Sequence, residues 1–146
     1  MAFPARGLKK LLFWGLGFLL VIQVIPYGRA HTNPPVVQEP AWDTPATREL
    51  ARRACFDCHS NETEWPAYSN VAPASWLIQK DVDQGREHLN FSEWQRPQEH
   101  ADDAAEQLRE KEMPLPHYIW LHGQAKLTDA EREQLAASLS KMFSTK

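Results

Sequence analysis

The run Cys55-Phe56-Asp57-Cys58-His59 constrains this chain more than any other feature of its sequence. Two thiols separated by two residues, with a histidine directly after the second, have the spacing with which haem is attached covalently to proteins. The thiols reach the two vinyl groups of one haem, and the histidine coordinates its iron. The run therefore predicts one covalently bound haem c, attached to Cys55 and Cys58, with His59 as an iron ligand.

Three other interpretations of the two cysteines remain open at this point. A zinc site needs four ligands, and the chain offers one cysteine pair with scattered histidines. A thioredoxin-type redox pair usually lies in a βαβ context, which this sequence lacks, and a structural disulfide leaves the adjacent histidine as an accident. Haem attachment is favoured because it agrees with export of the chain, for which the N-terminus provides independent evidence.

The first thirty residues differ from the rest and indicate a targeting segment. Arg6, Lys9 and Lys10 precede an apolar run over residues 11–25. By the positive-inside rule the N-terminus stays in the cytoplasm, and the following residues cross the membrane. Such a run suits a cleaved signal peptide, or an uncleaved anchor if flanking residues lengthen it. We favour the anchor, and expect a single-pass protein of the bacterial inner membrane whose haem domain faces the periplasm.

These features divide the chain into three parts. Residues 1–30 are the signal or membrane anchor, 31–43 are a proline-rich linker, and 44–146 are the c-type haem-binding domain. The prolines disfavour a helix in the linker, which is either a stiff spacer or a segment packed along the domain. The formal net charge is −3, and residues 1–30 hold four basic and no acidic residues, so the exported part is acidic. An acidic surface argues against a nucleic-acid partner.

Helix signals follow the linker. Asp43 or Thr44 can cap a helix that begins at Pro45, a position where the missing N–H costs nothing, and that runs into the cysteines. Residues 74–84 are expected to form a second helix that ends at Gly85.

Two more helices are expected in the C-terminal half. Residues 97–112 carry an apolar stripe, and Thr128 with Glu131 forms a capping box at the start of the last helix. No stretch alternates as a hairpin strand would. The expected fold class is all-α, a cytochrome c-like helical domain around one covalently bound haem, preceded by a single N-terminal transmembrane helix.

The ligand at the sixth position of the iron decides between electron transfer and ligand chemistry. Met113 is the candidate, because it follows an expected helix end, precedes Pro114 and lies in a loop 54 residues after His59. A thioether raises the reduction potential relative to a second imidazole. The competing ligands are His88, His100, His117 and His122; His31 is too near the linker to compete.

The surroundings of the haem can be predicted only in outline. Five tryptophans outside the anchor are expected to wall the pocket and exclude water: Trp42, Trp65, Trp76, Trp94 and Trp120. Arg86, Tyr68 or Asn70 can bind haem propionates. A backbone carbonyl near Pro66 or Pro73 is expected to accept the second N–H of the ligating imidazole.

Short motifs surround the cysteines in a specific order: Asn33-Pro34-Pro35-Val36, then His59-Ser60-Asn61-Glu62-Thr63, Trp65-Pro66, Tyr68-Ser69, Ala72-Pro73, Ser75-Trp76, Gly85-Arg86, Leu89-Asn90-Phe91-Ser92 and Met113-Pro114. Over about residues 26–143 they resemble the bacterial haem-binding-domain family of small, membrane-anchored, monohaem c-type proteins. The resemblance implies attachment of haem to Cys55 and Cys58, His59 as proximal ligand and Met113 as distal ligand.

The chain departs from the family's pattern at two positions. Ala67 stands where a second tryptophan is expected, which opens the pocket slightly. Lys111 stands where a glycine often precedes Glu-Met-Pro, which affects the approach to Met113.

The expected function is that of a membrane-anchored monohaem c-type cytochrome, which carries single electrons between redox partner proteins through a His/Met-ligated haem. No acid–base pair, nucleophile triad or phosphate loop appears, which favours a carrier over an enzyme. The alternatives are a haem-based gas or redox sensor or enzyme with an open or labile sixth iron position, and a haem subunit of a larger membrane redox complex.

Overall fold

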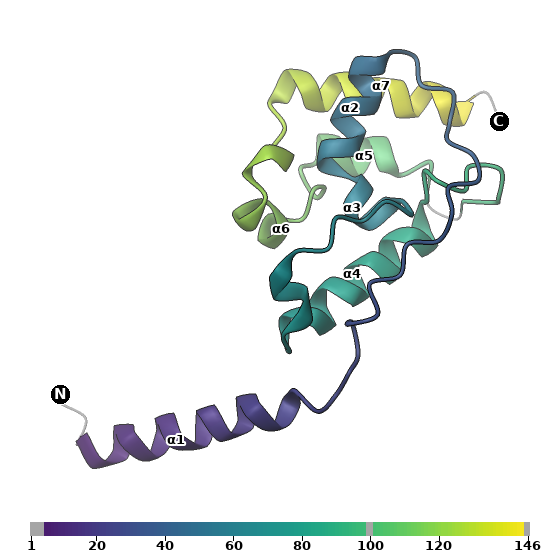
Figure 1. Ribbon diagram of the computed structural model, residues 1–146. Coiled ribbons are helices and arrows are strands. Elements are labelled where there is room, and N and C mark those ends of the chain that lie inside the picture. Colours follow the sequence, from purple (N-terminus) through teal and green to yellow (C-terminus); the bar gives the residue numbers. More distant parts are fainter. Residues whose placement is uncertain (1–4, 99–100, 145–146) are drawn as a thin grey trace. The chain divides into compact units, whose positions relative to one another are not determined.

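The structure is a computed structural model that describes residues 5–98 and 101–144 of the chain. In this part of the chain, seven α-helices and two short 3₁₀ helices are joined by loops (Figure 1). The one β interaction recorded there is an isolated bridge between Gln38 and Glu93. The expected all-α fold class is confirmed.

The chain divides into two compact units. The first joins residues up to 32 with residues 65–80, and it contains α1 (Ala5–Ile22), η1 (Ala67–Asn70) and the beginning of α4 (Ala74–His88). The second joins residues 33–64 with the chain from residue 81 onward, and it contains the end of α4 together with α2 (Pro45–Ala54), α3 (Phe56–His59), α5 (Ala104–Arg109), α6 (Pro116–Leu121), η2 (Gly123–Ala125) and α7 (Asp129–Ser144). The sequence-based division at residues 30 and 43 stays a prediction.

The helix α1 bears on the predicted membrane anchor. Its large apolar side chains are exposed, with Leu11 at 70% and Phe13 at 71%. The helix has 18 residues, three of them basic at its start, whereas a spanning helix needs about 20 apolar residues. Among the described residues, none of the helices combines the length and the apolar character that crossing a membrane requires. The predicted N-terminal transmembrane helix is therefore not supported.

The proline-rich segment packs along the second unit. The N–H groups of Val37 and Gln38 donate to the Ser92 carbonyl oxygen at 2.9 and 3.1 Å, and the N–H of Trp94 donates to the Gln38 carbonyl oxygen at 3.0 Å. An extended segment can make such bonds because its backbone groups are not used within a helix. Of the two alternatives for the linker, these residues take the packed one.

The helices α2 and α7 begin where their cap signals predict. The Thr44 hydroxyl accepts the N–H of Thr47 at 3.1 Å, with Pro45 in the first turn. At α7, the Thr128 N–H donates to the Glu131 carboxylate at 2.8 Å, and the Glu131 N–H donates to the Thr128 hydroxyl at 3.2 Å. Both orphan donors of the capping box are thus satisfied, as expected.

Two helix boundaries differ from the predictions. α4 continues through Gly85 to His88, so the glycine does not end the helix. The helix expected over 97–112 is restricted to α5, because residues 101–103 form a turn and Lys111 adopts a left-handed conformation with φ of +65°. Residues 99 and 100 of that expected helix lie outside the described residues.

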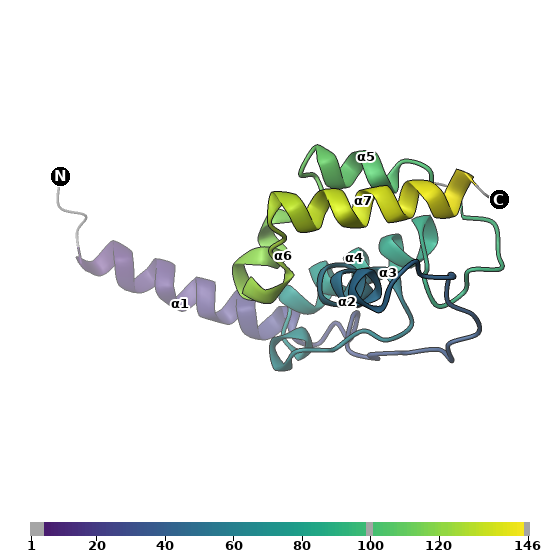
Figure 2. The ribbon, with the colours of Figure 1, turned by 90° about the horizontal axis from the view of Figure 1, so that it is seen from above.

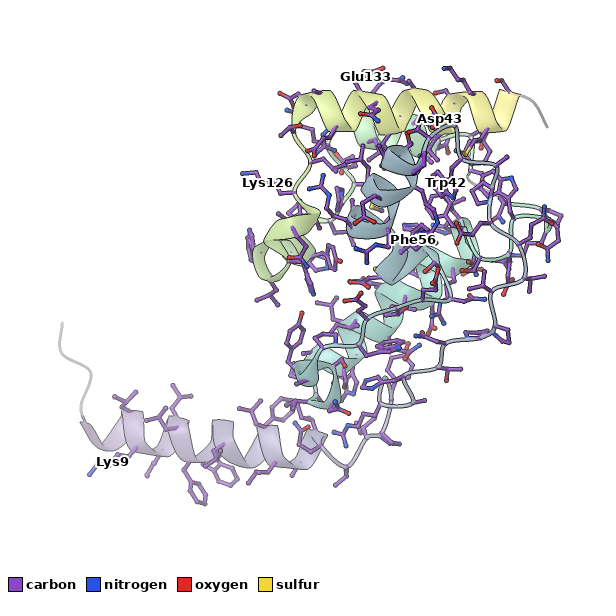
Figure 3. The ribbon with its side chains drawn as sticks, turned by 45° about the horizontal axis from the view of Figure 1, so that its top comes forward. Lys9, Trp42, Asp43, Phe56, Lys126 and Glu133 are labelled. Atoms are coloured by element: carbon purple, nitrogen blue, oxygen red, sulfur yellow. The ribbon has the colours of Figure 1, made fainter. Side chains whose placement is uncertain are left out.

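The core of the second unit combines aliphatic helix faces with an aromatic cluster. Figure 2 shows α5 and α7 side by side, and the buried Leu108 of α5 and Leu135 of α7 belong to one core. Around Phe91, ring centroids lie 5.3 Å away for Trp42 and 5.6 Å away for Phe56, two residues labelled in Figure 3. Offset and tilted aromatic pairs at these separations add to the stabilisation by area burial alone.

Replacing Lys111 by glycine is expected to stabilise the protein. A residue with a Cβ costs roughly 1–2 kcal/mol in the left-handed region, whereas glycine adopts it freely. Lys111 also forms an exposed ion pair with Asp129 at 2.9 Å, so Lys111→Ala, which loses the ion pair and keeps the strain, is the matched control. In urea unfolding, Lys111→Gly should exceed Lys111→Ala in free energy of unfolding by about 1 kcal/mol. If the Lys111→Gly and Lys111→Ala proteins were equally stable, the backbone at position 111 would not be strained.

Candidate functional site

A cavity of about 340 Å³ lies inside the second unit. One wall comes from α2, α3 and the end of α4, and the other from α5, the loop after it and α7. A second hollow of about 190 Å³ adjoins it, because the two share Ala54, Cys55, His59, His88, Met113 and Pro114. Together they have the size at which proteins bind small molecules and cofactors.

The structure brings all four predicted site residues to this cavity. Cys55, His59 and Met113 line both hollows, and Cys58 lines the smaller one. Burial raises the pKa of both thiols to about 12, so they are protonated at neutral pH. The two sulfurs therefore face the cavity as neutral thiols.

The alternative interpretations of the cysteines find no support in the part of the chain that the structure describes. The two cysteines are not joined by a disulfide bond. No group of three His, Cys, Asp or Glu side chains gathers there as a zinc site would require. These residues also form no βαβ unit around the cysteines.

The orientation of His59 is fixed from two directions. Its ring nitrogen Nδ1 lies 3.0 Å from the Leu89 carbonyl oxygen, and its own carbonyl oxygen accepts the N–H of Phe91 at 2.8 Å. A carbonyl can only accept, so Nδ1 carries the hydrogen and Nε2 is left with a lone pair for a metal. Burial lowers the pKa of His59, which keeps the imidazole neutral, as a metal ligand must be.

The carbonyl that binds the His59 ring is not the one expected. The prediction placed it near Pro66 or Pro73, and both of these lie in the first unit. Leu89 instead follows the last residue of α4 and lies in the second unit, next to the cysteine helix α3. The prediction was wrong because any backbone carbonyl can accept this bond, so no side-chain pattern marks the right one.

Gly85 allows α4 to approach the cysteine helix closely. A Cβ atom built on Gly85 would lie 2.4 Å from the carbonyl oxygen of Cys58. Real Cβ atoms do not come this near to a backbone atom, so any side chain here would push α4 away from α3. The glycine thus sets the distance between the second thiol and the segment that anchors His59.

A closed set of buried hydrogen bonds holds the loop after His59. Asn90 Nδ2 donates to Asn61 Oδ1, the Asn61 N–H donates to the Ser92 hydroxyl, and the Ser92 N–H donates to Asn90 Oδ1, each at 2.9 Å. All three residues are at most 3% exposed. Because every member is satisfied, the network fixes the two segments that flank the His59 imidazole. Sequence reasoning missed it, although all three residues belong to motifs of the resemblance.

The residues expected to bind propionates are placed elsewhere. The Arg86 guanidinium donates to the Ser60 carbonyl oxygen at 2.8 Å and to Asn33 Oδ1 at 3.0 Å, so it links α4 to the same loop. Tyr68 and Asn70 belong to η1 in the first unit. Among the described residues, none of these three candidates lines the cavity of the second unit.

The tryptophans do not wall the cavity, and this expectation was wrong for the described residues. Trp42 and Trp94 pack in the aromatic cluster, and Trp120 is 84% exposed. Trp65, which stacks on His31, and Trp76 belong to the first unit. The apolar walls are smaller side chains and one phenylalanine instead: Ala54, Leu89, Phe91, Ala104, Leu108 and Leu139.

Met113 lies in a loop that borders the cavity, and both its backbone N–H and its backbone carbonyl are hydrogen-bonded. Its N–H donates to the Gln107 carbonyl oxygen at 3.2 Å, and its carbonyl oxygen accepts Nη1 of Arg132 at 2.6 Å. Its side chain is partly buried against the core. The thioether therefore stands on a fixed backbone, on the wall formed by α5 and the loop after it.

Of the competing histidines, His88 is the one that the described structure places at the cavity, where it lines both hollows. His117 Nε2 lies 2.8 Å from Asp81 Oδ2, and His122 Nδ1 is bonded within its own helix end. His100 lies outside the described residues.

The donor set fits a haem. Cys58 and an oriented imidazole come from one short helix, Cys55 directly precedes it, a thioether comes from the opposite loop, and the space they share has mainly apolar walls. Among the groups at this space that could ligate iron are the His59 imidazole and the Met113 thioether, with His88 as a competitor.

The comparisons with known proteins agree with this fit. A family model described as haem-binding domain matches residues 17–141. No curated protein and no solved structure matches the chain.

Replacing Gly85 by alanine is expected to destabilise the protein despite the higher helix propensity of alanine. The added Cβ would meet the Cys58 carbonyl, and overpacking of this kind costs roughly 1–3 kcal/mol. Gly123→Ala is the matched control, because nothing lies within 4 Å of a Cβ built there. Urea unfolding followed by circular dichroism should show the loss for Gly85→Ala alone. A Gly85→Ala protein as stable as the parent would mean that α3 and α4 need not touch.

Proposed function

We propose, since the chain belongs to the haem-binding domain family, that it is a monohaem c-type cytochrome that carries single electrons. The observation that carries the proposal is that an oriented imidazole, His59, and a thioether, Met113, line one apolar cavity. When bound, the haem supplies an iron that exchanges one electron between its ferric and ferrous forms. The protein's part is to attach this group, ligate the iron and keep water away.

Attachment is assigned to Cys55 and Cys58. These two thiols would hold the haem through thioether bonds to its two vinyl groups. Cys55 is the N-cap of the short helix α3 and Cys58 lies within it, and both border the hollows that His59 also borders, which supports attachment on the side of this imidazole. A haem held in this way stays bound while the iron changes its oxidation state.

Ligation is assigned to Nε2 of His59 and Sδ of Met113. The hydrogen bond from Nδ1 to the Leu89 carbonyl fixes the tautomer and makes the imidazole a better donor to iron. A thioether disfavours the ferric form relative to a second imidazole, so it raises the reduction potential. With His59 and Met113 both holding the iron and mainly apolar walls around them, the site would favour electron transfer over chemistry on a bound substrate.

A sensor of small gaseous ligands is the second candidate function. Met113 stands on a loop between α5 and α6, so its thioether can leave the iron without unwinding a helix. Gln107 lines the same cavity and carries an amide that can donate a hydrogen bond to a ligand on the iron. Fast binding of carbon monoxide by the reduced parent protein would favour this function over the carrier.

Export to the periplasm and redox proteins as partners complete the proposal. Lys9 and Lys10 precede the apolar part of α1, which is the order found in export signals. Haem attachment of the c-type takes place outside the cytoplasm in bacteria, so the cysteine motif implies export, which the N-terminal segment supports independently. The donors and acceptors of the electron are assigned here only as redox proteins of that compartment.

Optical spectra test the axial ligands. The oxidised protein, matured with covalent haem, should show the weak near-infrared band of charge transfer from sulfur to ferric iron. Met113→Ala should remove this band, because no other thioether lines the cavity among the described residues. His88→Ala is the matched control at the same cavity and should retain the band. If His88→Ala alters the axial ligation and Met113→Ala does not, the second ligand is His88 and the assignment fails.

Haem staining on denaturing gels tests covalent attachment and export together. The double variant Cys55→Ala, Cys58→Ala should lose the stain completely, because no thioether can form. Deletion of residues 1–30 should also lose it, because the chain then stays where attachment does not occur. Lys126→Glu, a charge change on an exposed residue, should leave the stain unchanged. A stain that survives loss of both cysteines would rule out the c-type assignment.

A further inference from the structure

Arg132 is a buried cation on α7 with an unusual set of partners. It is 8% exposed, and its Nη1 donates to two backbone carbonyls, that of Leu108 at 2.8 Å and that of Met113 at 2.6 Å. Its Nε is buried and has no hydrogen-bond partner. Among the described residues, no carboxylate forms an ion pair with it.

Burial of an arginine without a carboxylate is costly, because carbonyl dipoles replace its water only in part. The neighbouring charges of α7 are arranged differently: Glu131 pairs with Arg53 at 2.6 Å in a partly buried ion pair, and Glu133 pairs with Arg109 at 2.9 Å in an exposed one. A purely structural role at position 132 could be filled by an aliphatic side chain at lower cost. The buried positive charge of Arg132 therefore indicates a role beyond packing.

The two carbonyls that Arg132 binds are the two ends of one loop. Leu108 lies in the last turn of α5, where carbonyl oxygens carry partial negative charge, and its carbonyl oxygen also accepts the N–H of Lys111 at 3.2 Å. Met113 follows after the left-handed residue Lys111, and its N–H donates to the Gln107 carbonyl oxygen. Backbone bonds thus close this turn, and one guanidinium nitrogen adds a second link between its two ends, at the residue whose side chain lines the cavity.

We propose that Arg132 is a positioning residue for the iron ligand: it sets the Met113 thioether at the haem and, through its charge, favours the ferrous state. This inference rests on the proposed function, in which Met113 ligates the iron. The charge acts because the ferric form carries one more positive charge than the ferrous form. In a dry interior a fixed cation nearby repels that extra charge, and this raises the reduction potential.

The test uses the full chain matured with haem, in two variants that separate position from charge. Arg132→Gln removes the charge and shortens the reach to the two carbonyls. Arg132→Lys keeps the charge on a single donor group. Leu135→Val, on the same helix and in the same core, controls for a general loss of stability, and Arg109→Gln controls for the loss of a cation that does not touch Met113.

Three measurements follow the iron itself: the near-infrared sulfur band, the reduction potential, and the rate at which the ferrous protein binds carbon monoxide after the thioether leaves. In Arg132→Gln the band should weaken, the potential should fall, and the rate should rise about tenfold, the factor that corresponds to one lost hydrogen bond from a charged donor. Arg132→Lys should raise the rate while keeping most of the potential. Both controls should match the parent.

The proposal is overturned if Arg132→Gln has the band, potential and rate of Leu135→Val, because the arginine would then act on stability alone. It is also overturned if Arg109→Gln lowers the reduction potential as much as Arg132→Gln does, because the potential would then depend on the total charge of the protein and not on this position. Failure of the proposed function gives a different result: the parent protein lacks the sulfur band, and Met113→Ala changes nothing.

Discussion

The site in the second unit depends on the hydrogen bonds between His59 and the segment that follows α4. The ring bond to the Leu89 carbonyl selects the tautomer, and the backbone bond from Phe91 fixes the helix that carries the ring. Because Gly85 removes the side chain that would separate the two helices, α4 can bring this segment within reach. The geometry of the cavity's first wall follows from these contacts, since Cys58 lies in the same short helix as His59 and Cys55 directly precedes that helix.

The opposite wall is built in another way. Met113 is supplied by a loop rather than by a helix, and that loop has few side chains in the core. Its position depends on a local backbone bond to Gln107 of α5 and on one long-range contact, with the Arg132 side chain of α7. The two walls are therefore held differently: a buried side-chain network holds the imidazole, whereas a local turn and one guanidinium hold the loop of the thioether. Such a difference allows the potential to be adjusted on one side without disturbing attachment on the other.

The parts of this site that sequence reasoning predicts are those with a local signature. The cysteine run, the cap at Thr44 and the capping box at Thr128 each depend on residues that are neighbours in the chain. The Leu89 carbonyl has no signature, because every residue carries the same acceptor. The prediction that tryptophans wall the cavity was wrong because aromatic residues fill a core as readily as they line a pocket. Arg132 gave no signal at all, because its role appears only when α7 packs against the loop at Met113.

The buried polar residues around His59 explain why a small domain can hold an oriented ligand without a sheet. Loops usually lie at the surface because their backbone groups need water. Here Asn61, Asn90 and Ser92 provide those partners inside the protein, so two irregular segments can be buried against each other. An irregular segment suits the site, since a carbonyl beyond the end of α4 is not required to accept a helical N–H and is available to the imidazole. The polar network is thus the condition under which a main-chain oxygen becomes available to the ligand of the iron.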